Sequence, residues 1–147
     1  MRVIVVGAGI AGLSAAIALR RTGNDAVVLE RAPRIDPGGA GITLFANARR
    51  ALDRLGVGEA VAARGAAATR SAILTREGRE LTRVPPDLLE GTIALHRSDL
   101  QAELAAAAGE VRLGVEVTVV EQRDDAVVAV AADGGEERGD LLVGADG

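Results

Sequence analysis

The sequence of 147 residues has no cysteine, no lysine and one aromatic residue, Phe45. Without cysteine it can form no disulfide framework, thiolate metal site or thiol nucleophile. A single histidine, His96, is too few for a histidine-rich metal site, so no metal is expected. The scarcity of aromatic side chains excludes a base-stacking platform. A net charge of −4 also argues against nucleic acid as a partner.

Long hydrophobic runs are absent as well. No apolar stretch approaches the ~18–20 residues of a membrane span, and the N-terminus has neither the basic region nor the cleavage site of a signal peptide. We therefore expect no membrane partner and a cytoplasmic location. The composition, with 48% hydrophobic and 26% charged residues, is typical of one globular domain. Arginine without lysine, beside abundant alanine, glycine and valine, suggests a GC-rich bacterial origin.

The first 30 residues predict a strand, a helix and a second strand. Residues 2–6 are a β-branched apolar run, as expected for a strand buried on both faces of a parallel sheet. The segment GAGIAG follows at once, and residues 13–21 then have apolar side chains at helical spacing. Residues 26–29 form a second apolar run, which closes with Glu30. This βαβ unit predicts an α/β fold, a Rossmann-like domain with a parallel sheet.

The rest of the sequence predicts two more helices, a hairpin and three strands. The helices are expected at 45–55, ended by Gly56, and at 98–108, where Ser98 and Gln101 form a capping box. The other expected segments are a loop at 31–41, a helical or irregular stretch at 60–68, a hairpin of 71–75 with 79–84, and strands at 116–121, 126–131 and 140–143.

The glycine motif carries the functional prediction, because it follows a strand, opens a helix and has an acidic residue about 20 positions on. Gly7 permits the tight turn, Gly9 leaves room for a pyrophosphate, and Gly12 lets the helix pack close to the strand. The phosphates would lie at the helix N-terminus, where free N–H groups favour negative charge. Glu30 can accept hydrogen bonds from a ribose and would repel a 2′-phosphate, which argues against NADP here. The pattern alone leaves FAD, NAD and an unrelated glycine-rich turn open.

Four segments, in this order, carry a resemblance to a known family: VIVVGAGIAGLSAAIALRRTGNDAVVLER, GAGITLFANARRALDRLGV, LHRSDLQAEL and DLLVGADG. They resemble the N-terminal part of the FAD-dependent aromatic-ring hydroxylases, the group that shares the p-hydroxybenzoate hydroxylase fold. Salicylate hydroxylases and tetracycline-inactivating monooxygenases belong to this group. The resemblance runs from Arg2 to Gly147.

The resemblance implies a tightly but non-covalently bound FAD. The implied cofactor-binding residues are Gly7, Gly9, Ile10, Ala11, Gly12, Glu30, Arg31, Arg97 and Asp146. Arg31 would lie beside the adenosine, Arg97 would reach the phosphate or ribityl region, and Asp146 would lie near both FAD and NAD(P)H. The two arginines can also be read as surface charges, and Asp146 as part of a turn. His96 is expected to face solvent, and no catalytic residue is assigned.

For a whole protein the resemblance implies a monooxygenase that uses NAD(P)H and O₂ to hydroxylate or epoxidise a small organic molecule, aromatic or polycyclic. Residues 69–90 are expected to reach into the sheet of a substrate domain. Because family members are several hundred residues long, residues 1–147 are interpreted as the N-terminal portion of such an FAD-binding domain. It would include a β-meander crossover and be incomplete at its C-terminus. The chain alone is expected to be inactive, and to self-associate or need the missing part. The alternatives are a flavin-dependent reductase or dehydrogenase, or a non-catalytic ADP- or FAD-binding fragment.

Overall fold

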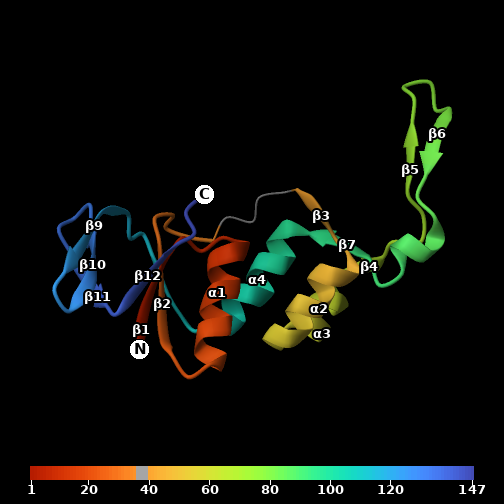
Figure 1. The fold of residues 1–147 in the computed structure, drawn as a ribbon. Helices are drawn as coiled ribbons and strands as arrows, with labels where there is room; N and C mark the ends of the chain where they lie inside the picture. The colour runs from red at the N-terminus through yellow and green to blue at the C-terminus, as the bar shows by residue number, and fades with distance from the viewer. Residues whose placement is uncertain (36–39) are drawn as a thin grey trace.

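A four-stranded parallel sheet forms the centre of the computed structural model, which describes residues 1–35 and 40–147 (Figure 1). The expected loop at 31–41 lies partly outside these residues. The sheet has the order β12-β1-β2-β8, and neighbouring strands are parallel. Its strands are β1 (Arg2–Val6), β2 (Asp25–Glu30), β8 (Glu110–Leu113) and β12 (Leu141–Gly144). The α/β prediction with a parallel sheet is thus confirmed.

Strand β1 is buried on both faces, as its apolar sequence predicted. Successive side chains of a strand point to opposite faces of the sheet. Val3 and Val5 accordingly join the core cluster of the helical side, whereas Ile4 joins the cluster on the other side. Burying each such side chain stabilises the fold by about 1.5–3 kcal/mol. This explains why an unbroken apolar run, without alternation, predicted a central strand.

Helices cover one face of the sheet (Figure 1). Helix α1 (Ile10–Arg21) connects β1 to β2 and packs against α4 (Arg97–Ala108), which also contacts α3 (Gly58–Arg64). Helix α2 (Ala46–Leu55) ends at Gly56, whose φ of +81° is left-handed, as expected for a glycine stop. Among the described residues, no helix combines the length and apolarity needed to cross a membrane.

An antiparallel meander covers the other face. It consists of β9 (Val117–Arg123), β10 (Ala126–Ala131) and β11 (Glu136–Gly139), in the order β11-β10-β9. Ala129 of β10 packs with Ile4, Val27 and Leu29 of the parallel sheet. The meander lies between β8 and β12 in the sequence, so it forms the crossover that the resemblance implied.

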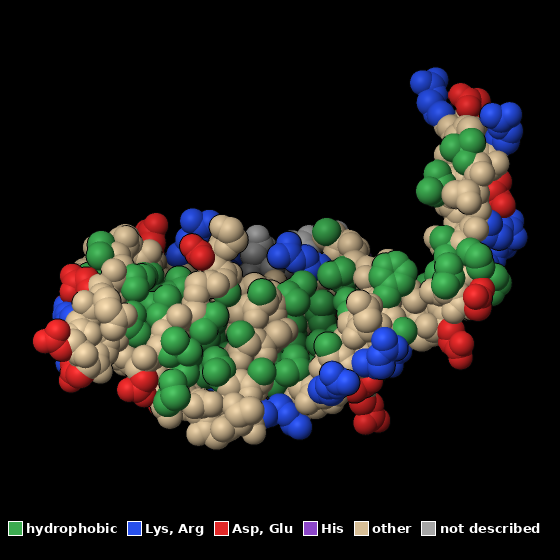
Figure 2. Space-filling model, in the orientation of Figure 1, with side chains coloured by type: hydrophobic (Ala, Val, Ile, Leu, Met, Phe, Trp, Pro, Cys, Tyr) green, Lys and Arg blue, Asp and Glu red, His purple; other side chains and the backbone are tan. Residues whose placement is uncertain are grey.

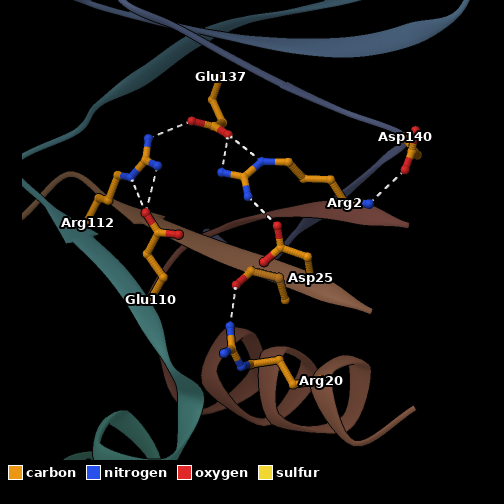
Figure 3. A network of polar contacts seen from close by, with 8 residues as sticks. Arg2, Arg20, Asp25, Glu110, Arg112, Glu137 and Asp140 are labelled. Atoms are coloured by element: carbon orange, nitrogen blue, oxygen red, sulfur yellow. Dashed lines mark hydrogen bonds and ion pairs between the residues drawn. The ribbon is translucent and has the colours of Figure 1, made fainter. Parts of the chain in front are cut away.

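A charged network joins the meander to the amino ends of the parallel strands (Figure 3). Glu137 of β11 accepts hydrogen bonds from Arg2, at 2.7 Å, and from Arg112 of β8, at 2.6 Å. Arg2 is also paired with Asp25 of β2. Hydrogen bonds to Glu137 and Asp25 raise the pKa of Arg2. The amino ends of the parallel strands are therefore occupied by ion pairs within the chain. Their carboxyl ends are left for a ligand.

The expected hairpin is present as β5 (Ala72–Leu74) and β6 (Glu80–Arg83). It projects away from the other elements, beyond the 3₁₀ helix η1 (Pro86–Leu89) (Figures 1 and 2). Ile73, Leu74 and Leu81 are exposed on it. Its assignment to a substrate domain stays a prediction.

The sequence did not predict five short strands, one of which, β4 (Ala66–Ala67), lies in the stretch 60–68 that was expected to be helical or irregular. The other four are β3 (Gly41–Leu44), β7 (Ile93–His96), β8 and β11, and β7 pairs with both β3 and β4. The capping box at Ser98 was wrong. Helix α4 begins one residue earlier, with His96 at the N-cap position, and no described side chain caps it. Gln101 instead donates a hydrogen bond to the glycine loop.

Candidate functional site

A cavity of about 700 Å³ lies where β1, β2 and β12 end and α1 begins. In open α/β sheets, ligands bind at the carboxyl ends of the strands. Eight of the nine predicted cofactor-binding residues line this cavity: Gly7, Gly9, Ile10, Ala11, Glu30, Arg31, Arg97 and Asp146. The ninth, Gly12, is buried beside the loop in α1. Residues from both ends of the chain are thus brought to one place.

The three glycines of the motif differ in what surrounds them. Gly7 has a φ of +108°, and a Cβ there would lie 2.5 Å from the carbonyl oxygen of Ala145. A Cβ on Gly12 would collide with the carbonyl oxygen of Gly7. By contrast, no described atom lies within 4 Å of a Cβ built on Gly9, which lines the cavity. Folding of the chain therefore explains two of the glycines, and the third is open toward the space where a ligand would lie.

The first turn of α1 offers free backbone donors to the cavity. Gly9 is the N-cap residue of α1. The first helical hydrogen bond runs from the N–H of Leu13 to the carbonyl of Gly9, at 3.0 Å. No described side chain caps this end, and its first turn contains no acidic residue. The N–H groups of a first helical turn have no partner within the helix. Together with the helix dipole, they favour an anionic group such as a phosphate.

Glu30 lies at the end of β2 and holds the loop in place. Its Oε2 accepts a hydrogen bond from the N–H of Ala8, at 2.7 Å, and its Oε1 accepts one from the N–H of Ala32, at 2.9 Å. A carboxylate has about four lone-pair sites. Glu30 can therefore keep both bonds and still accept hydroxyl donors from a ligand.

Arginine side chains surround the cavity mouth. Arg31 directly follows β2, Arg34 lies three residues further on, and Arg97 is the first residue of α4. All three are exposed, so they can reorient toward a bound anion. Asp146 follows β12 and is exposed as well. His96 is exposed, as expected, and is not among the described residues that line the cavity.

Several cavity residues were missed by the sequence analysis. They are Val6, Ala8, Leu29, Ala32, Arg34, Ile35, Gln101, Val115, Glu116, Val117, Ala145 and Gly147. Val115 lies in the connection from β8 to β9, where its N–H donates to the carbonyl of Glu30 at 2.9 Å, and no local motif marks this connection. Gln101 could have been found, because it follows Arg97 by four residues, and such residues share one face of a helix.

Comparisons with known proteins agree with this geometry. A family described as FAD binding domain matches residues 1–147. The chain is 39% identical to the aurachin C monooxygenase/isomerase of Stigmatella aurantiaca over 154 residues. It is 38% identical to 3-hydroxybenzoate 6-hydroxylase 1 of Aquipseudomonas alcaligenes over 159 residues. These alignments cover 100% and 99% of this chain and 40% of each relative, so the chain spans about two fifths of the relatives' length.

Solved structures match the fold as well. HpxO of Klebsiella pneumoniae, in complex with FAD and uric acid, superposes with a TM-score of 0.86 at 34% sequence identity. The match covers 97% of this chain and 38% of HpxO. The tetracycline destructase Tet(51) superposes with a TM-score of 0.77 at 28% identity, over 99% of this chain and 38% of its own. Both kinds of protein thus share the arrangement of strands that builds the cavity.

Proposed function

We propose, from the premise that the chain belongs to the FAD-binding domain family, that its cavity holds the ADP half of FAD. The observation that carries this proposal is the contrast among the glycines: Gly7 and Gly12 are enclosed by the chain's own atoms, whereas Gly9 opens onto the cavity. The volume of the cavity, about 700 Å³, lies within the ~300–1,000 Å³ typical of small-molecule sites.

The roles of the residues follow from their positions. Gly9, Ile10 and Ala11 carry the backbone groups proposed to meet the pyrophosphate, on a loop shaped by Gly7 and Gly12. Glu30 is proposed to accept the ribose hydroxyls, and Arg31 to lie beside the adenosine. Arg97 is proposed to reach the phosphate or ribityl region, and Asp146 the side shared by FAD and NAD(P)H. The binding is proposed to be tight and non-covalent in a whole protein.

The activity proposed for a whole protein that contains this chain is monooxygenation with NAD(P)H and O₂. Bound FAD supplies the redox and oxygen chemistry, and the residues of this chain bind and orient the cofactor. The names of relatives support this reaction class, since they include 3-hydroxybenzoate 6-hydroxylase and FAD-dependent urate hydroxylase. The proposed substrate is a small aromatic or polycyclic molecule. A reductase or dehydrogenase that inserts no oxygen is the alternative.

Oxygen-18 labelling tests the reaction class. In a protein that contains this chain and turns over, one atom from ¹⁸O₂ should appear in the product, because a monooxygenase takes the inserted atom from O₂. Mass spectrometry of the product measures the label. A product formed with NAD(P)H oxidation but without label from O₂ would establish the reductase or dehydrogenase alternative instead.

A Glu30→Gln substitution tests the nucleotide site. We expect it to weaken ADP binding by about 1.5–3 kcal/mol, the range for hydrogen bonds that involve a charged group. The wild-type chain should also prefer ADP to its 2′-phosphorylated analogue, and this preference should shrink in the variant because the repelling charge is gone. Titration calorimetry measures both affinities.

Glu103→Gln is the matched control for Glu30→Gln. Glu103 pairs with Arg64 at 2.8 Å and is not among the described residues that line the cavity. The same loss of charge there should leave ADP affinity unchanged. If Glu30→Gln bound ADP as tightly as the control does, Glu30 would not be the ribose ligand.

Association through the parallel sheet is a further proposal. β12 is an outer strand, and its Leu141 side chain is 44% exposed. An outer strand presents backbone groups that can pair with another strand. This supports either self-association or pairing with further sequence. Light scattering on the chain of 147 residues tests self-association, and a monomer at all concentrations would count against it.

A further inference from the structure

The peptide groups of Ala8 are held from two sides by side chains. Its N–H donates to Glu30 Oε2 at 2.7 Å, and its carbonyl oxygen accepts a hydrogen bond from Gln101 Nε2, also at 2.7 Å. Glu30 comes from β2 and Gln101 from α4, a helix that lies beside α1 (Figure 1). A long-range contact across 93 positions of sequence therefore ends on the second residue of the glycine motif.

The hydrogen bond from Gln101 orients the whole peptide unit between Ala8 and Gly9, and not the carbonyl group alone. The peptide unit is planar and trans, so the carbonyl of Ala8 and the N–H of Gly9 point in opposite directions. Holding the Ala8 carbonyl therefore also sets the direction of the Gly9 N–H. Gly9 has unusual conformational freedom because it lacks a side chain, and no described atom would contact a Cβ built on it. Without a tether, this peptide unit could turn at low cost.

We propose that Gln101 is a positioning residue for the phosphate-binding loop. By holding the Ala8 carbonyl, it presents the loop's N–H groups in the orientation that a pyrophosphate needs before the ligand arrives. The loop then loses less conformational freedom on binding, and preorganisation of this kind increases affinity. The inference rests on the proposed nucleotide site and adds a residue that acts on the site through Ala8.

Direct contact between Gln101 and a ligand is the alternative role, because Gln101 lines the cavity. The two roles differ in which ligands they affect. A loop tether acts on the pyrophosphate, which ADP and FAD share, so losing the tether weakens both ligands by the same factor. A contact with the part of FAD beyond the pyrophosphate affects FAD alone.

Calorimetric titration of the 147-residue chain with ADP and with FAD separates these roles. Gln101→Met keeps the length of the side chain and removes the donor. We expect roughly 2- to 12-fold weaker binding of both ligands, the factor that one neutral hydrogen bond supplies. Gln122→Met is the control, since Gln122 also donates to backbone carbonyls but lies near the end of β9 in the meander; it should leave both affinities unchanged.

A Gln101→Glu variant adds a pH test. A carboxylate has no proton to donate to the Ala8 carbonyl, whereas a protonated carboxyl group does. Its affinity for ADP, relative to wild type at the same pH, should be low near neutrality. The relative affinity of the Gln101→Glu variant should recover as the pH falls toward ~4.3, the ordinary pKa of a glutamate. A ratio that does not change with pH would contradict the tether.

The tether can also be tested without a ligand. In the free chain, Gln101→Met should shift the NMR amide resonance of Gly9 and increase its mobility, whereas Gln122→Met should do neither. Unchanged Gly9 resonances, or a loss of affinity for FAD alone, would overturn the inference. If the wild-type chain bound neither ADP nor FAD, the proposed function would be wrong, and the amide resonances would still decide whether Gln101 positions the loop.

Discussion

A Gly9→Val chain is expected to fold normally and to lose nucleotide binding. Gly9 has φ −72° and ψ 178°, an extended conformation that valine adopts readily. No described atom lies within 4 Å of the position its Cβ would take, so the stability of the chain should change by no more than about 0.5 kcal/mol. The added methyl groups would occupy the space proposed for the pyrophosphate.

The expected loss of affinity for Gly9→Val is roughly 100-fold or more. Keeping the pyrophosphate away from the start of α1 removes at least two hydrogen bonds to a charged group, each contributing about 1.5–3 kcal/mol. Calorimetry with ADP measures this loss, and urea unfolding checks that the fold is intact. A folded Gly9→Val chain that bound ADP with wild-type affinity would show that the phosphates lie elsewhere.

The first 31 residues predicted two central strands, the helix between them and part of the lining of the candidate site, because their signals are local. An apolar strand, a glycine turn, an amphipathic helix and a second apolar strand are contiguous in sequence, and β1 and β2 pair as nearest neighbours. The carboxylate of Glu30 then reaches the loop because both strands end at the same edge of the sheet. Each step depends on residues that the pattern itself contains.

Two of the missed strands, β8 and β11, lack such a local signal. β8 has the sequence EVRL, and β11 has EERG. Their charged side chains are explained by the ion pairs that Glu110, Arg112 and Glu137 form with one another and with Arg2 (Figure 3). Glu137 is distant in sequence from its partners Arg2 and Arg112. Propensity therefore favours a loop at these positions, whereas tertiary pairing makes a strand.

The same reason explains why the lining of the candidate site was only partly predicted. Arg97 and Asp146, which line the cavity, were named through the resemblance, since nothing in their own neighbourhood points to a phosphate. Gln101 was assigned to the local helix end, because Ser98 precedes it at the spacing of a capping box. The structure gives its amide a partner on the glycine loop instead. The Gln101 side chain can either cap the local helix end or bond to the distant glycine loop. Sequence spacing predicts only the local capping.

A Gly12→Val chain is expected to show the opposite behaviour from Gly9→Val. A Cβ on Gly12 would collide with the carbonyl oxygen of Gly7 and lie 3.3 Å from the Ala145 side chain. The Gly7 carbonyl cannot easily move, because it shares a planar peptide unit with the N–H of Ala8, which donates to Glu30 Oε2 at 2.7 Å. Forcing extra groups into a packed interior costs about 1–3 kcal/mol. The total stability of a domain is only about 5–15 kcal/mol.

Urea unfolding of Gly12→Val should therefore have a midpoint well below that of the wild-type chain. Gly9→Val is its matched control, since it places the same side chain in the same glycine motif. ADP binding of Gly12→Val should weaken only in proportion to the unfolded fraction or to displacement of the loop, because the new side chain points toward Gly7 and Ala145. Equal midpoints for the two valine variants would contradict the packing of α1 against β1. Different midpoints, with ADP binding lost in Gly9→Val, would separate the glycines that the fold requires from the one that the ligand requires.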